Sequence, residues 1–160
     1  YSFPCRGGGK IEDVLEYLRN ILSKFDTEDV LYDVQVPEAD LNNPSKYSNI
    51  TLNKNALNYD ELEIHWVNNN GAKGIQRIII NRYTNNGGYI RGFSISILVP
   101  ATGSSQLSCW IQVGFFTVAE DGLSIKTSYG YQALLEKSGA NSIDKICRIM
   151  IEKVIGIKKA

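Results

Sequence analysis

The sequence predicts a single α+β domain, in which an antiparallel meander sheet of five to six strands carries an N-terminal and a C-terminal helix packed on one face. Two observations lead to this fold class. Apolar residues recur with a helical period near both ends of the chain, whereas the middle alternates polar and apolar residues between short Asn/Gly turns. At 160 residues, with 43% hydrophobic and 21% charged residues, the chain has the size and composition of one folded domain.

The first helix is the clearest element. Residues 1–10 contain three consecutive glycines and predict a flexible lead-in, which lacks the preceding strand and the residue spacing of a phosphate-binding loop. A single apolar stripe of helical period then follows, formed by Ile11, Val14, Leu15, Leu18, Ile21, Leu22 and Phe25. Acidic residues in its first turn and Lys24 in its last suit the helix dipole. We expect this stripe to pack on the sheet.

The middle of the chain predicts the sheet. Residues 28–36 alternate as a strand, and residues 38–58 form a long polar loop that is either functional, disordered or the site of a short strand near residues 47–52. Five further strands are expected within residues 60–129, and their short turns require antiparallel neighbours. The strand at 107–118 is apolar on both faces, which favours a central position.

The end of the chain predicts helix. Residues 131–137 form a short amphipathic segment, and a final helix begins after Asn141 or Ser142. Its stripe comprises Ile143, Ile146, Cys147, Met150, Val154 and Ile157. Because other isoleucines widen this apolar face, we expect the helix to be buried on more than one side or to meet another chain.

Composition excludes several classes of function. Seventeen basic residues balance seventeen acidic ones, which disfavours a nucleic-acid partner, and no apolar run reaches membrane-spanning length, so the expected protein is soluble. The chain begins at Tyr1, which leaves a removed signal peptide and the compartment open. Cys5, Cys109 and Cys147 have no metal-binding spacing, and a bridge between two of them stays open.

The candidate catalytic residues are Glu63 and His65, which share one strand face. A carboxylate beside a histidine can serve as a base and its orienting group. Since His65 is the only histidine, a catalytic metal site lacks a third ligand of that kind, and no metal or other cofactor is expected. The common role of a single histidine on a polar strand face is a solvated surface residue.

The candidate binding residues are aromatic. Tyr83, Tyr89, Tyr129 and Tyr131 lie near turns or strand ends, where they form either a binding surface or edge packing, and Met150 lies on the final helix. The sequence therefore favours a non-catalytic binding or protein-interaction module. Its expected partner is a protein, including a second copy joined through the C-terminal helix, or a small apolar ligand held between sheet and helix. The alternative is a small hydrolase or isomerase that uses His65 and Glu63.

Overall fold

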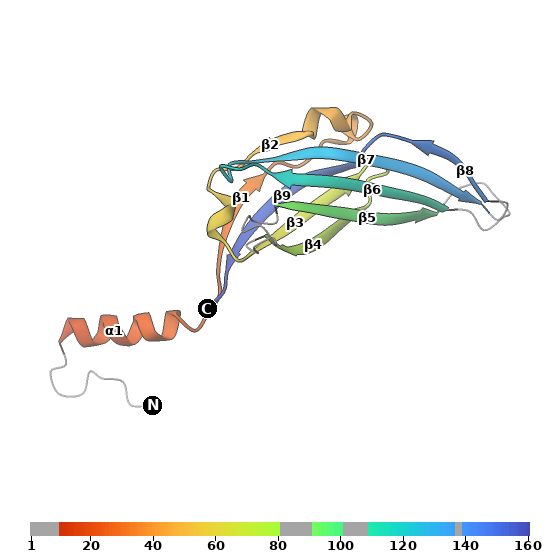
Figure 1. Ribbon diagram of the computed structural model, residues 1–160. Coiled ribbons are helices and arrows are strands. Elements are labelled where there is room, and N and C mark those ends of the chain that lie inside the picture. Colours follow the sequence, from red (N-terminus) through yellow and green to blue (C-terminus); the bar gives the residue numbers. More distant parts are fainter. Residues whose placement is uncertain (1–9, 81–90, 101–108, 137–138) are drawn as a thin grey trace.

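The computed structural model describes residues 10–80, 91–100, 109–136 and 139–160, and in this part of the chain two antiparallel sheets face each other with one α-helix outside them (Figure 1). The helix is α1 (Ile11–Leu22). The strands are β1 (Thr27–Asp33), β2 (Asn49–Thr51), β3 (Glu61–Asn68), β4 (Lys73–Ile79), β5 (Gly92–Pro100), β6 (Cys109–Val118), β7 (Ser124–Glu136), β8 (Gly139–Asp144) and β9 (Ile149–Lys158), and the 3₁₀ helices are η1 (Glu38–Asp40), η2 (Pro44–Tyr47) and η3 (Ala56–Asn58).

The first sheet brings the first and last strands of the described chain together. Its strand order is β1-β9-β3-β4, so β9 pairs with β1 on one side and with β3 on the other. Ile64 of β3 lies opposite Val154 of β9, and both side chains are buried. Nearly every residue of β9 is at least partly buried, which explains why this strand carries apolar residues on both faces and does not alternate regularly.

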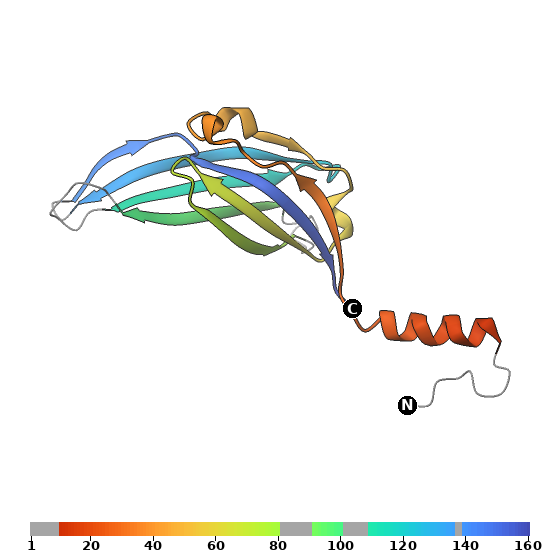
Figure 2. The same cartoon turned by 180° about the vertical axis from the view of Figure 1, so that it is seen from behind.

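The second sheet has the order β2-β7-β6-β5, with β8 paired to the far part of β7 (Figure 2). β7 pairs with β2 near its beginning and with β8 near its end, while its other edge follows β6. β6 is an interior strand, as its two apolar faces predict. Gly114 of β6 lies opposite Gly130 of β7, and this glycine pair lets Cys147 pack close against the sheet.

The hydrophobic core fills the space between the two sheets. Leu31, Ile64 and Val154 from the first sheet belong to the same buried cluster as Ile95 and Phe116 from the second. Burying one such side chain contributes about 1.5–3 kcal/mol. A second, smaller buried cluster comprises Val36, Val67 and Met150, with Leu41 and Tyr47 packed against it.

A buried set of amide side chains joins the two sheets beside this core. Asn68 of β3 is fully buried and donates from Nδ2 to Oε1 of Gln112 on β6 (3.1 Å). Gln112 Nε2 in turn donates to Asn69 Oδ1 (2.8 Å) and to Gln132 Oε1 (2.7 Å). Asn68 Oδ1 accepts the backbone N–H groups of the β3–β4 turn, where Gly71 adopts a φ of 82°.

The prediction of an α+β fold with helices on one sheet face is wrong. Of the expected short helical segment 131–137, residues 131–136 belong to strand β7 and residue 137 lies outside the described residues, and the expected C-terminal helix is replaced by β8 and β9. The reason lies in residues 149–157, where apolar residues dominate on both sides of Glu152 and Lys153, a composition that fits a strand buried on both faces as well as a broad helix. A ligand or a second copy held by a C-terminal helix is therefore ruled out, because that helix is a strand.

The polar segment 38–58 is largely ordered by its own contacts. It contains η1, η2, β2 and η3, so the alternative with a short strand near residues 47–52 is the one observed. Asp40 accepts hydrogen bonds from Lys46 Nζ (2.8 Å) and from the Tyr47 hydroxyl (2.7 Å). The bond to Asp40 raises the pKa of Tyr47 to about 12. The lead-in at residues 1–9 lies outside the described residues.

Candidate functional site

Helix α1 has clear sequence reasons to form and to end. Glu12 and Asp13 lie in its first turn and Arg19 in its last, where each charge favours the helix dipole. The chain leaves the helix at Ser23, whose N–H donates to the carbonyl of Arg19 (2.9 Å) and whose hydroxyl donates to the carbonyl of Asn20 (2.9 Å). Twelve residues alone make a marginal helix in water, so such a helix normally depends on packing.

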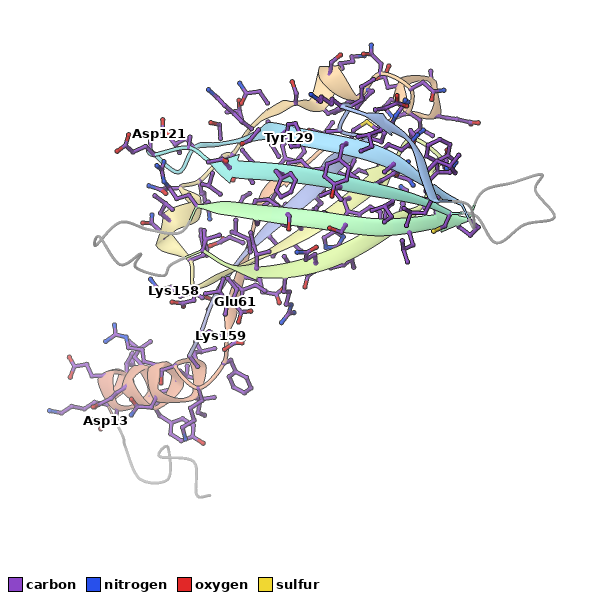
Figure 3. The ribbon with its side chains drawn as sticks, turned by 45° about the vertical axis from the view of Figure 1, so that its right-hand side comes forward. Asp13, Glu61, Asp121, Tyr129, Lys158 and Lys159 are labelled. Carbon is purple, nitrogen blue, oxygen red and sulfur yellow. The ribbon has the colours of Figure 1, made fainter. Side chains whose placement is uncertain are left out.

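The apolar stripe of α1 is open to solvent along its length. None of its twelve residues is buried, and Ile11 and Leu22 are 79% and 65% exposed. Phe25, just beyond the helix, is 63% exposed. Figure 3 shows the helix standing clear of both sheets, beyond the end where β1 begins and β9 finishes. The sequence predicts the stripe correctly, but the expected packing of this stripe on the sheet is wrong.

A cluster of charges fixes the point where α1 leaves the sheets. Asp26, between α1 and β1, accepts hydrogen bonds from Ala160 N (3.0 Å) and from Lys159 Nζ (3.1 Å). These two donors hold the pKa of Asp26 below its usual value. Lys159 Nζ also lies 3.6 Å from the Glu61 carboxylate, and Lys159 N donates to Asp60 (2.8 Å). The connection to the helix is thereby tied to the end of β9 (Figure 3).

The polar face of α1 carries no basic excess. The charged residues within the helix are Glu12, Asp13, Glu16 and Arg19, and Lys10 and Lys24 flank it. A helix that lies on an anionic membrane surface usually has a strongly basic polar face. The charges of α1 therefore favour a protein surface as the partner of its apolar stripe.

The predicted pair Glu63 and His65 comes together on β3. His65 Nε2 and Glu63 Oε1 are 2.9 Å apart, and Arg77 Nε of β4 donates to Glu63 Oε2 (3.0 Å). The hydrogen bonds from His65 and from Arg77 lower the pKa of Glu63. Glu63 is thus an ionised carboxylate with both oxygens occupied, which suits it to orient His65 rather than to accept a proton.

A shallow pocket of about 370 Å³ lies beside His65. Its lining also includes Trp66, Gly74 and Ile75, together with Lys73 and Glu152. Lys73 Nζ is 3.1 Å from Glu152, so the one amine in the lining is already paired. No serine, threonine or cysteine in the described part of the chain lines this pocket, so among these residues the histidine and its carboxylate have no hydroxyl or thiol nucleophile next to them.

The predicted tyrosines are only partly brought together. The rings of Tyr129 and Tyr131 on β7 lie 6.3 Å apart, and Tyr129 lies 5.9 Å from the ring of Phe115 on β6. Tyr129 is 49% exposed, so this aromatic cluster reaches the outer surface of the second sheet. Tyr83 and Tyr89 lie outside the described residues.

Met150 is buried, whereas Cys109 and Cys147 are half-buried. Met150 is buried against Val36 and Val67, on the β9 strand rather than on the expected helix. Cys109 and Cys147 are free thiols, and Cys5 lies outside the described residues. Among the described residues no group of histidine, cysteine and acidic side chains is arranged to hold a metal ion.

Comparison with other proteins adds no homologue to this picture. No protein-family model, curated protein or solved structure matches the chain. Within the described ranges, no helix has the length and apolar character needed to cross a bilayer. Among the candidate functional sites described above, the stripe of α1 has the most exposed apolar side chains.

Proposed function

We propose that this protein is a non-catalytic interaction module that assembles with further copies of itself through α1. The observation that carries the proposal is a fully amphipathic helix with no buried residue. In a folded protein the stripe of such a helix is normally covered, because large exposed apolar patches mark interaction surfaces. The described sheets already bury their inner faces against each other and leave this stripe uncovered.

The spacing of the stripe favours another helix as the covering surface. Residues 11, 14, 18, 21 and 25 are separated alternately by three and four positions, which is the repeat that places side chains along a helix–helix seam. Leu15 and Leu22 lie next to this seam and widen it to the face seen in helical bundles. A second copy supplies a matching helix of the same length with the same apolar stripe.

The exposed side chains are sufficient to drive such an association. Ile11, Leu15, Leu18, Leu22 and Phe25 are between 43% and 79% exposed. Together they correspond to about three fully exposed apolar side chains, whose burial contributes roughly 4–9 kcal/mol per helix. Association costs about 4–15 kcal/mol of lost freedom, so two helices are expected to associate with a dissociation constant of roughly micromolar order.

Sedimentation velocity over about a hundredfold range of concentration around the micromolar tests the proposal. We expect the native chain to sediment increasingly as an oligomer as the concentration rises. The Leu18→Glu variant should remain monomeric, since it places a charge in the seam, whereas Asn20→Glu on the polar face should behave as the native chain. A native chain that stays monomeric throughout the range, or equal behaviour of the two variants, contradicts the proposal.

A second candidate function, a small hydrolase or isomerase, is supported by the hydrogen bond between Glu63 and His65. It requires a substrate that supplies its own reacting hydroxyl or acidic proton, because the neighbouring pocket offers no nucleophile. Turnover that disappears in His65→Ala, while thermal unfolding stays cooperative, would establish this function in place of the first. Unchanged turnover in that variant would exclude it.

A further inference from the structure

An open pocket of about 460 Å³ lies at the end of β9 opposite to α1, and we infer that it binds a small organic oxyanion, a carboxylate or a phosphate monoester. Three segments that are distant in sequence form it: the chain around η2, the beginning of β7 and the link between β8 and β9. The lining residues are Asn42, Asn43, Pro44, Ser45, Ser48, Thr127, Lys145, Ile146, Cys147, Arg148 and Ile149. This inference does not depend on association through α1.

The charge of the lining selects an anion. Lys145 and Arg148 both line the pocket, and no aspartate or glutamate among the described residues does. Neither cation forms an ion pair within this part of the chain. Asp40, one of the two acidic residues of the neighbouring η1, is already held by Lys46 and Tyr47. The pocket therefore presents two positive charges that its own walls leave uncompensated.

Arg148 gives the more specific argument. Its Nε atom is inaccessible to solvent and has no hydrogen-bond partner among the described residues. A buried donor on a charged group is costly when it is left without an acceptor. A guanidinium offers parallel N–H donors that match the two oxygens of a carboxylate or a phosphate. An oxyanion in the pocket would pair with the part of the half-buried Arg148 side chain that lines it and would offset the positive charge of the guanidinium.

The remaining walls set the size and character of the ligand. Ser45, Ser48 and Asn43 add polar groups on the η2 side, while Pro44 and the half-exposed Ile146 add apolar surface. This mixture fits an anionic group on a small apolar body better than an inorganic ion alone. Burial raises the pKa of the Cys147 thiol, which also donates to the carbonyl of Ile149 (3.4 Å), so this cysteine is part of the wall and not a nucleophile.

The pocket depends on a close approach between the link before β9 and the second sheet. A Cβ on Gly130 would lie 2.5 Å from Cys147 Cα and would overlap its Cβ. Because Gly130 has no side chain, the segment that carries Lys145 and Arg148 can run directly against β7. The backbone that carries the two cations is thus positioned by the packing of Cys147 on β7, which preorganises the pocket for binding.

Amide chemical-shift titration of the full chain with sodium isobutyrate and, separately, inorganic phosphate tests the inference, with sodium chloride holding the ionic strength constant. We expect saturable shifts at Ser45, Ser48, Thr127 and Lys145, with a dissociation constant of roughly 1 mM for the anion that fits. Saturation by isobutyrate alone assigns a carboxylate, and saturation by phosphate assigns a phosphate group. Absence of saturable shifts with both anions overturns the inference.

Variants show whether the binding is specific. Arg148→Gln and Lys145→Gln should each weaken binding about tenfold or more, since each removes a charge-assisted hydrogen bond. Lys158→Gln, an exposed lysine at the far end of β9, should leave it unchanged. Because Lys145 is exposed, Lys145→Gln should fold normally, and it tests the anion site even where Arg148→Gln fails to fold. Equal weakening by Lys145→Gln and Lys158→Gln would show nonspecific attraction and refute the site.

Discussion

Replacing Asn68 by alanine removes the central member of the buried amide set that joins the sheets. Asn68 Oδ1 accepts from Asn70 N (3.0 Å) and Ala72 N (2.9 Å), and Asn68 Nδ2 donates to Gln112 (3.1 Å). The turn amides lie near the surface and can bind water, at a loss of about 0.5–1.5 kcal/mol each. Gln112 is 1% exposed, and leaving its Oε1 atom without a hydrogen-bond donor costs a further ~1–3 kcal/mol.

The expected decrease in the free energy of unfolding is therefore about 2–6 kcal/mol for Asn68→Ala. Equilibrium denaturation with urea measures it, and the slope with denaturant should not change. Asn70→Ala is the matched control in the same turn: its side chain is exposed, so its effect should stay within about 0.5 kcal/mol. A double-mutant cycle with Gln112→Ala should show a coupling of at least ~0.5 kcal/mol. A loss below about 1 kcal/mol for Asn68→Ala would refute the view that this bridge holds the sheets together.

Two further outcomes are expected from the packing of the second sheet and from two tyrosines. Gly130→Ala should lower the free energy of unfolding by about 1–3 kcal/mol, because the added Cβ would meet Cys147. Gly92→Ala is the control and should change it little, since its added Cβ would have its nearest neighbour at 3.8 Å. Thermal or urea unfolding of both variants checks this. Burial and a hydrogen bond to a carboxylate raise the pKa of Tyr59 to about 12, and a similar bond raises that of Tyr47 to about 12. Their contribution to stability is therefore complete below pH ~10 and lost as the pH rises through 12. Difference absorbance against Tyr47→Phe and Tyr59→Phe should show ionisation near pH 12, and ionisation near pH 10 would disprove these contacts.

Much of the sheet could be predicted from local pattern, because alternation and turn chemistry act over a few residues. The Asn68–Gly71 turn between β3 and β4 and the interior position of β6 are examples. The prediction of a C-terminal helix is wrong because an interior strand buried on both faces loses the alternation that identifies strands. The abundance of β-branched isoleucine in residues 149–157 was the signal that favoured a strand.

The candidate sites could likewise be predicted only where local sequence pattern determines them. The pairing of Glu63 with His65 could be predicted, because residues two apart on a strand share a face. The stripe of α1 was equally clear, but periodicity shows which face is apolar and not what covers it. No sequence pattern indicates the pocket around Arg148, because its lining comes from three segments that are distant in sequence: η2, β7 and the β8–β9 link. The sequence pattern predicted a loop for the first of these segments and a helix for the last.

Hydrogen exchange of the α1 amides at two protein concentrations is the most direct test of association through this helix. A twelve-residue helix without packing should exchange nearly as fast as an unfolded chain. We predict that amides 15–22 become protected at least tenfold more strongly at high concentration, equivalent to ~1.4 kcal/mol, while those of β9 do not change. Leu18→Glu should abolish the gain. Protection of α1 that is the same at both concentrations would contradict the account.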